Sequence, residues 1–230
     1  MSKTCLLLGA TGLVGSHCLQ LLCNDPTYEK ITVLVRRKFT FEHEKVNVVV
    51  INFDQMDDYE SYFNVDDVFC CLGTTMKKAK TKSNFRKVDF YYPLNAATLA
   101  KKMRAKQFLL VSAYGAKVNS PFFYNKVKGR LEEAVSELPI NSIHMIKPSL
   151  LVGNRNEFRL AEQLGIWFRP IYTPFLRGKF ANFRPIEASV VAEAMLKIAN
   201  SNVRGLYYYT PKELRTLSKE YTNEVETDVL

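Results

Sequence analysis

Apolar and polar positions along the chain follow two alternating patterns, one typical of buried strands and one of amphipathic helices. Short, mainly apolar runs stand at 5–8, 31–35, 46–51, 68–72, 107–112 and 143–146. Each run is too short for a helix and suits a strand buried on both faces. Between the runs, apolar residues recur every three or four positions, as on the inner face of a helix. This alternation predicts a doubly wound α/β fold with a mostly parallel sheet and helices on both faces.

Several segments depart from this regular alternation. We expect a short helix at 56–63, and a long helix that starts near Ser83 or Asn84 and ends near Lys102. Pro93 interrupts the long helix, so a bend or two pieces are expected there. A further helix is predicted at 190–198 and a last strand at 206–209. The polar residues after about Ser218 are expected to form a frayed tail.

The length of 230 residues and the absence of a Gly/Ser- or Pro-rich linker predict a single domain over 1–230. We expect its substrate-side region within 153–185 and 200–218. The stretch 167–183 mixes aromatics, prolines and arginines without a period. It is equally consistent with a pocket lining and with a loop that covers the core.

Composition excludes several classes of protein. Apolar residues make up 47% and charged residues 24% of the chain, which is ordinary for a globular protein. No apolar run reaches the ~18 residues that span a bilayer, and no secretory pattern opens the chain, so we expect a cytoplasmic protein. The five cysteines are interpreted as reduced core residues. The scattered histidines and cysteines suggest no metal site.

The formal net charge of +9 fits nucleic acid, an anionic membrane or an anionic cofactor. No nucleic-acid-binding signature with stacking aromatics accompanies it, so we expect no nucleic-acid partner. The densest basic run, at 77–82, is interpreted as a solvated loop and helix start near a site.

Three glycines, Gly9, Gly12 and Gly15, lie between the first strand and the first helix. In a strand–loop–helix turn, one glycine permits the tight turn, one lets the backbone approach a pyrophosphate, and one lets helix and strand pack closely. The helix N-terminus then favours a phosphate. The alternative is an ordinary β-to-α turn. We expect this Rossmann-type loop, with Thr11, Leu13 and Val14, to bind a dinucleotide.

The residues at the ends of the next strands indicate which dinucleotide binds. Arg36 and Arg37 follow the second strand about twenty residues after the glycines, where an acidic residue would bind the ribose of NAD and an arginine suits the 2′-phosphate of NADP. They favour NADP(H), although a surface arginine pair is the alternative. Asp54 is a candidate adenine contact or a turn cap. Leu72, Gly73 and Thr74 follow the fourth strand, where a small residue lets the backbone pass close to the cofactor.

Ser112, Tyr124 and Lys128 form a second constellation. Tyr124 and Lys128 are four residues apart on a predicted helix, so their side chains share one face. An ammonium beside a phenol favours the phenolate and equips the tyrosine for acid/base catalysis. Ser112 ends the fifth strand, where its hydroxyl would meet a substrate carbonyl. The alternative is an ordinary surface pair on an amphipathic helix.

With these residues the chain resembles the short-chain dehydrogenase/reductases, which have a Rossmann fold and a Ser, Tyr-x-x-x-Lys catalytic set. The resemblance covers nearly the whole sequence and is carried by 9–15, 111–112, 124–129 and 148–153. The segments 71–75, 85–89 and 122–126 look most like the atypical, extended-like branch that includes the Tat-interacting oxidoreductase group.

The resemblance implies a role for each matching residue. Tyr124 would donate and accept the proton, Lys128 would bond the nicotinamide ribose, and Ser112 would orient the carbonyl. Pro148 and Ser149 match the stretch that borders the nicotinamide. Three positions depart from the pattern. Ala113 replaces a second serine, which would leave Ser112 structural if that position held the carbonyl. Lys147 stands where an arginine commonly precedes the proline, and Asp89 stands where many extended members have asparagine.

Two functions from different classes follow. The first is an NADP(H)-dependent oxidoreductase acting on a small-molecule carbonyl or alcohol, with catalytic Ser112, Tyr124 and Lys128. The second is a non-enzymatic NADP(H)-binding regulator or scaffold that reports redox state to a protein partner, because fold alone does not give function.

Overall fold

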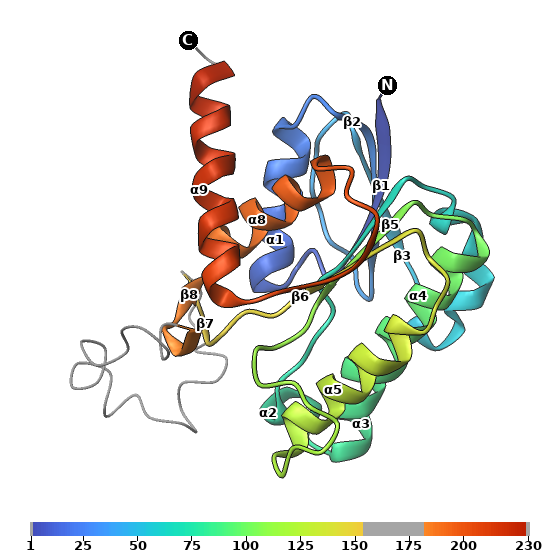
Figure 1. The fold of residues 1–230 in the computed structure, drawn as a ribbon. Helices are drawn as coiled ribbons and strands as arrows, with labels where there is room; N and C mark the ends of the chain where they lie inside the picture. Colours follow the sequence, from blue (N-terminus) through green and yellow to red (C-terminus); the bar gives the residue numbers. More distant parts are fainter. Residues whose placement is uncertain (1, 154–181, 229–230) are drawn as a thin grey trace.

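A parallel sheet of seven strands forms the centre of the protein in the computed structural model, which describes residues 2–153 and 182–228 (Figure 1). The strands lie in the order β3-β2-β1-β4-β5-β6-β9, and every neighbouring pair is parallel. They are β1 (Lys3–Leu8), β2 (Tyr28–Val35), β3 (Val46–Val50), β4 (Asp67–Cys70), β5 (Gln107–Val111), β6 (Ser142–Ile146) and β9 (Gly205–Tyr209). The predicted doubly wound α/β fold is confirmed, with β9 added beside β6.

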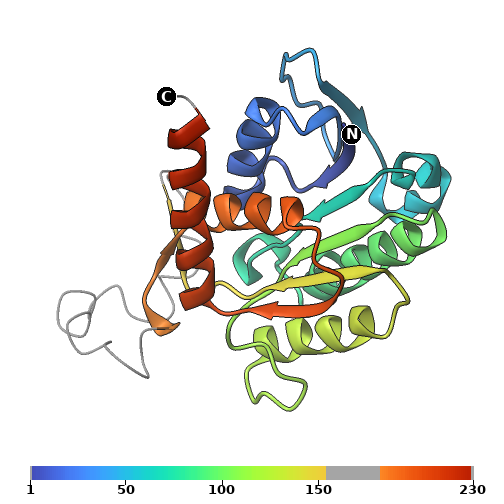
Figure 2. The same cartoon turned by 45° about the horizontal axis from the view of Figure 1, so that its top comes forward.

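Helices cover both faces of the sheet (Figure 2). On one face lie α1 (Leu13–Asn24) and α8 (Ala188–Asn200). On the other lie the 3₁₀ segment η1 (Phe53–Phe63), α4 (Tyr92–Lys102) and α5 (Phe123–Ser136). Successive side chains of β1 alternate between the two cores, because neighbouring residues of a strand point to opposite faces.

The predicted long helix consists of three joined pieces. These are α3 (Lys82–Arg86), a π-helical segment η2 (Lys87–Tyr91) and α4, preceded by a short α2 (Met76–Ala79). Pro93 lies in the first turn of α4, where its missing N–H costs little. The expected interruption is confirmed. The helix begins earlier than expected, because the Thr81 hydroxyl caps it by accepting a hydrogen bond from the Asn84 backbone N–H.

The expected frayed tail after Ser218 is wrong. These residues continue α9 (Pro211–Asp228), which packs across α8. Leu214 is fully buried, and the Ser218 hydroxyl donates to Glu193 of α8 at 2.5 Å. Leu217 and Tyr221 also pack against the core. The helix is therefore fixed by tertiary contacts that a mainly polar sequence conceals.

The predicted substrate-side region is described in part. Its stretch 154–181 lies outside the described residues, and so does most of 167–183. At its borders, β7 (Leu151–Val152) and β8 (Ile186–Glu187) form a small parallel pair. The other part, 200–218, contains β9 and the beginning of α9. The single-domain organisation stays a prediction.

All five cysteines are free thiols. Four of them are buried, whereas Cys71, which is also expected in the core, is partly exposed. Among residues 2–153 and 182–228, no helix is long and apolar enough to cross a membrane. In the same described residues, no group of three or more potential metal ligands is found.

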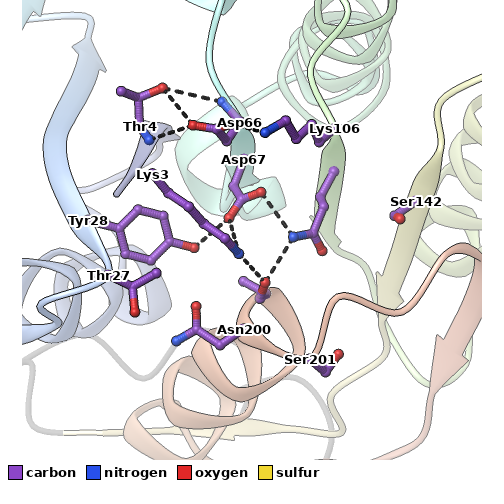
Figure 3. Close-up of polar contacts among 12 residues, drawn as sticks. Lys3, Thr4, Thr27, Tyr28, Asp66, Asp67, Lys106, Ser142, Asn200 and Ser201 are labelled. Carbon is purple, nitrogen blue, oxygen red and sulfur yellow. Dashed lines mark hydrogen bonds and ion pairs between the residues drawn. The ribbon is translucent and has the colours of Figure 1, made fainter. Parts of the chain in front are cut away.

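A buried polar network lies at the amino ends of the strands, opposite the ends that carry the glycine loop (Figure 3). Asp67 is its centre and accepts hydrogen bonds from the Tyr28 hydroxyl at 2.6 Å and the Gln107 amide at 3.0 Å. Lys3 lies 3.4 Å from the same carboxylate. Lys3 and Gln107 also donate to the Ala199 carbonyl at 2.7 and 2.8 Å. The network joins four strands, β1, β2, β4 and β5, to the end of α8.

Candidate active site

The glycine loop has no room for side chains at two of its three glycines. Gly9 has a left-handed φ of +85°, and a Cβ there would lie 2.5 Å from the Cys71 carbonyl oxygen. A Cβ on Gly15 would lie 2.2 Å from the Gly9 carbonyl oxygen. The Gly12 N–H donates to that same oxygen at 2.8 Å and closes the turn. The loop is thus held tightly between β1, α1 and the segment after β4.

The N-terminus of α1 is left uncapped. Gly12 occupies the N-cap position and provides no side-chain hydrogen bond, and the first turn contains no acidic residue. The first N–H groups of a helix have no partner within the helix, and they carry the positive end of its dipole. This terminus is therefore suited to a phosphate.

A cavity of about 430 Å³ opens in front of the loop. It lies between the carboxyl ends of β1, β2 and β4, where the strand order reverses direction and ligands bind in open α/β sheets. Its lining comprises Gly9, Ala10, Thr11, Gly12, Leu13, Leu34, Val35, Arg36, Phe53, Cys71, Leu72, Gly73, Thr74, Lys78, Ala79, Asn84, Lys87, Val88 and Tyr92.

Half of the predicted cofactor residues line this cavity. They are Gly9, Thr11, Gly12, Leu13, Arg36, Leu72, Gly73 and Thr74. The others, which do not line it, are Val14, Gly15, Arg37, Asp54, Tyr124, Lys128, Pro148 and Ser149. Val14 and Gly15 are buried beneath the loop, whereas Arg37 is exposed. Of the arginine pair, Arg36 is therefore the member at the cavity.

Sequence reasoning missed the wall formed by α2, α3 and η2. Lys78, Asn84 and Lys87 place polar groups there, and Val88 and Tyr92 complete it. The signal was the basic run at 77–82, interpreted as a solvated loop near a site. Its position over the cavity depends on tertiary packing, which a sequence pattern does not specify.

Asp54 reaches the cavity only through its neighbours. It accepts hydrogen bonds from Lys87 and from the Tyr92 hydroxyl, each at 2.7 Å. The bonds from Lys87 and then Tyr92 lower the pKa of Asp54 below its usual range. Because both partners line the cavity, Asp54 is an anchor for two wall residues, and a direct adenine contact stays a prediction.

Tyr124 and Lys128 lie one turn apart on α5, as the spacing predicts. The Tyr124 ring packs edge-on against buried Phe85 of α3, with centroids 5.8 Å apart. The Lys128 side chain is only 3% exposed and forms an ion pair with Asp89 of η2 at 3.0 Å. A Cβ on Gly73 would lie 4.0 Å from the Lys128 ammonium. Lys128 is therefore directly behind the cavity wall at Gly73.

Ser112 has a buried partner that the sequence prediction did not include. Its hydroxyl donates to Glu132 of α5 at 2.5 Å, and Lys147 binds the other carboxylate oxygen at 2.5 Å. Ser112 is 4% exposed. Its role with a substrate carbonyl stays a prediction, and this contact favours a structural role. The signal for Glu132 was its position four residues after Lys128, on the same helix face.

Pro148 and Ser149 follow β6 and are held by backbone contacts. The Pro148 carbonyl accepts from the Tyr114 N–H at 2.9 Å, and the Ser149 hydroxyl donates to the Arg184 carbonyl. Their predicted contact with the nicotinamide stays a prediction.

Comparison with known sequences adds the family. The NAD(P)H-binding family model matches residues 9–137. Protein HTATIP2 of Rattus norvegicus is 36% identical over 199 residues, which cover 85% of this chain and 80% of that protein. Protein FMP52, mitochondrial, of Candida albicans is 30% identical over 209 residues, covering 86% and 89% of the two chains.

Solved structures agree on the fold. A short chain dehydrogenase family protein from Francisella tularensis subsp. tularensis SCHU S4 superposes with a TM-score of 0.68 at 12% identity, covering 93% of this chain and 99% of that chain. UDP-glucose 4-epimerase from Thermotoga maritima gives 0.64 at 15% identity, covering 94% and 82%. The chain belongs to the NAD(P)H-binding family, with HTATIP2 as a homologue and the fold of the short-chain dehydrogenases.

Proposed function

We propose that this protein is an NADP(H)-dependent oxidoreductase that acts on a carbonyl or alcohol group of a small molecule. The observation that carries the proposal is the position of the buried Lys128 ammonium. It lies one helical turn after Tyr124 and directly behind Gly73 of the cofactor cavity. A buried ammonium at this position supports an acid/base role for Tyr124 and Lys128 beside the cofactor.

The fit of the cofactor rests on the cavity itself. The loop has no room for side chains at Gly9 and Gly15, and the first turn of α1 leaves its N–H groups available to phosphate. Arg36, Lys78 and Lys87 add positive charge to the lining. Arg36 is at the end of β2, where a guanidinium suits the 2′-phosphate of NADP(H) with charge-assisted hydrogen bonds.

The residues of the chain would then supply the proton chemistry. Tyr124 donates its phenolic proton to the substrate oxygen during reduction and takes it back during oxidation. The Lys128 ammonium stabilises the phenolate that Tyr124 becomes after donation. When bound at this site, NADP(H) would provide the hydride for the reduction and take it up in the oxidation.

The catalytic assignment is tested by Tyr124→Phe, measured as NADPH consumption with a panel of aldehydes and ketones. We expect kcat to fall by about 10²–10⁴-fold, because the general acid is lost while the ring packing is kept. Tyr91→Phe is the matched control, since Tyr91 is 59% exposed on η2, and it should retain full activity. An unchanged rate in Tyr124→Phe would contradict the assignment.

The cofactor preference is tested by fluorescence titration with NADPH and NADH. Wild-type protein should bind NADPH more tightly, and Arg36→Asp should weaken NADPH binding by about 10–100-fold through loss of charge-assisted bonds to the 2′-phosphate. Arg37→Asp changes the net charge equally, but Arg37 does not line the cavity, so we expect it to keep the preference. Equal affinities in the wild type would remove the argument for NADP(H).

One observation favours the second candidate, a non-enzymatic NADP(H)-binding regulator or scaffold with a protein partner. The Ser112 proton is donated to Glu132, so this hydroxyl has no second proton for a carbonyl. If NADPH binds tightly and no carbonyl or alcohol is turned over, this alternative replaces the oxidoreductase.

The cellular location belongs with these proposals. We expect a cytoplasmic protein from the sequence, whereas the related FMP52 of Candida albicans carries the description mitochondrial. The cytoplasmic location therefore stays a prediction, to be decided by imaging the full chain in cells.

A further inference from the structure

A small basic cavity lies between the first turns of α9 and the segment that enters β8 (Figure 1). Its volume is about 180 Å³, and it shares no lining residue with the cofactor cavity. The lining comprises Arg184, Lys212, Arg215, Thr216 and Lys219. Four of these side chains are cations at neutral pH, and the fifth contributes a hydroxyl. Among the described residues, the lining therefore offers positive charge and hydrogen-bond donors but no carboxylate.

The walls of this basic cavity come from two segments that are joined by backbone contacts. The four lining residues of α9 recur every three or four positions, so they share one face of the helix. Arg184 comes from the segment before β8. The Arg215 guanidinium joins the two segments, because it donates to the carbonyls of Pro211 at 2.9 Å and of Arg184 at 2.8 Å. The cations are thus held together by the fold.

The positive charge of the basic cavity is not balanced within the protein. In the stretches 2–153 and 182–228, none of its four cations forms an ion pair with a carboxylate. The Arg184 Nε is buried and has no hydrogen-bond partner in that part of the chain. Burial, and then the charge of Arg184, lower the pKa of Arg215 below its usual range. A bound anion would relieve this repulsion and accept from the buried donor.

The N-terminus of α9 does not supply the site, because its first N–H groups have partners. The Lys212 N–H donates to the Asn182 side chain and the Leu214 N–H to the Thr210 carbonyl, each at 3.0 Å. Glu213, a carboxylate of the same turn, accepts from the Thr210 N–H at 2.7 Å and from its hydroxyl at 2.6 Å. Recognition of an anion would therefore come from the side chains that line the basic cavity.

We infer that the basic cavity binds the phosphate group of a small ligand, at a site separate from the cofactor cavity. A phosphate monoester carries a charge of about −1.5 to −2 and three strong acceptor oxygens, which suits several cationic donors, whereas a carboxylate brings a single charge. Pockets for drug-sized ligands measure about 300–1,000 Å³. A cavity smaller than this suits a phosphate group better than a whole nucleotide. The inference does not depend on the use of NADP(H).

The first experiment is an NMR titration of the isotope-labelled full chain with inorganic phosphate at constant ionic strength. We expect saturable shifts of the backbone amide signals of residues 212–219. The signals of Gly12 and Leu13 report phosphate at the glycine loop and are fitted separately. Acetate should bind at residues 212–219 about 10-fold more weakly than phosphate. Phosphate shifts confined to the glycine loop, or equal affinities for acetate and phosphate, would overturn the proposal.

The double variant Lys212→Gln/Lys219→Gln tests the side chains. We expect it to weaken phosphate binding at residues 212–219 by about 10–100-fold, because charge-assisted hydrogen bonds are lost. The matched control is Lys30→Gln/Lys101→Gln, which removes the same charge at two exposed positions outside the basic cavity. It should bind phosphate as the wild type does. Equal weakening in both double variants would overturn the proposal, because it would show a general effect of net charge.

A single variant covers the case in which the double variant loses its fold, as judged by circular dichroism. Arg184→Gln keeps the backbone carbonyl that Arg215 and Ser149 contact, and it should weaken phosphate binding by about 10-fold. An unchanged affinity in Arg184→Gln would overturn the proposal.

A phosphate group could belong to a soluble metabolite or to a lipid headgroup, and cosedimentation with vesicles separates these sources. The vesicles contain phosphatidylcholine with or without phosphatidic acid. Cosedimentation that needs phosphatidic acid and is lost in Lys212→Gln/Lys219→Gln supports the site with a lipid ligand. Phosphate binding in solution without cosedimentation supports the site with a soluble ligand. Cosedimentation that the double variant retains, together with unchanged phosphate binding, would overturn the proposal.

Discussion

At the scale of single residues, His144 shows how burial changes the chemistry of a side chain. It lies in β6, fully buried, with Nδ1 3.1 Å from the Tyr209 hydroxyl. Its Nε2 has no hydrogen-bond partner among the described residues. Burial therefore disfavours the imidazolium and lowers the pKa of His144 to about 4.

This lowered pKa predicts a loss of stability in mild acid. The unfolded histidine titrates near pH 6.5, so the unfolded chain binds a proton first as the pH falls. The contribution of neutral His144 to the free energy of unfolding is fully present above about pH 6.5. It is lost as the pH falls toward 4, and the loss reaches about 3 kcal/mol. His144→Gln should remove this part of the pH dependence in urea unfolding measured between pH 7 and pH 4.5.

A wild-type and a His144→Gln protein whose stabilities change in parallel with pH would contradict the prediction.

At the scale of elements, α9 is held on the core by a few apolar residues within a mainly polar sequence. Its polar residues dominate the sequence after Ser218, while Leu214, Leu217 and Tyr221 recur every three or four positions and face the core. Propensity alone does not hold a helix of this length in water, so packing against α8 decides its stability.

Leu214→Ala tests this packing. Removal of a fully buried leucine side chain should lower the free energy of unfolding by about 2–5 kcal/mol. Leu206→Ala is the control, since Leu206 is 42% exposed on β9, and should cost much less. Chemical denaturation of both variants gives the comparison, and equal losses would show that α9 does not depend on Leu214.

The elements that the sequence predicts well are those whose signal is local. The strands at 5–8 and 107–112 are apolar throughout, and the interruption at Pro93 follows from a missing N–H. The part of α9 after Ser218 was not predicted. Three apolar residues within a charged segment are weak evidence for a packed helix when the α8 surface that they contact is unknown.

At the scale of the whole molecule, the candidate site was predictable only where spacing encodes it. The glycine loop and the Tyr124–Lys128 pair have fixed intervals; the loop lines the cavity, and Lys128 lies behind Gly73. The spacing gives Asp89 no role, and it places Glu132 only on the helix face of Lys128, because the partners of both carboxylates come from other elements. The cavity wall at Lys78 and Lys87 likewise depends on how α2, α3 and η2 fold back over the sheet.

The network around Asp67 can form only late in translation, because its members lie far apart in the sequence. Lys3 and Gln107 donate to the Ala199 carbonyl across sequence separations of 196 and 92 residues. At about 5–20 residues per second, Ala199 is made roughly 5–18 s after Gln107. During that interval the sheet face that α8 will cover is exposed on the ribosome. The hydrogen bonds from β1 and β5 to Ala199 can therefore form only after the last third of the chain has been partly synthesised.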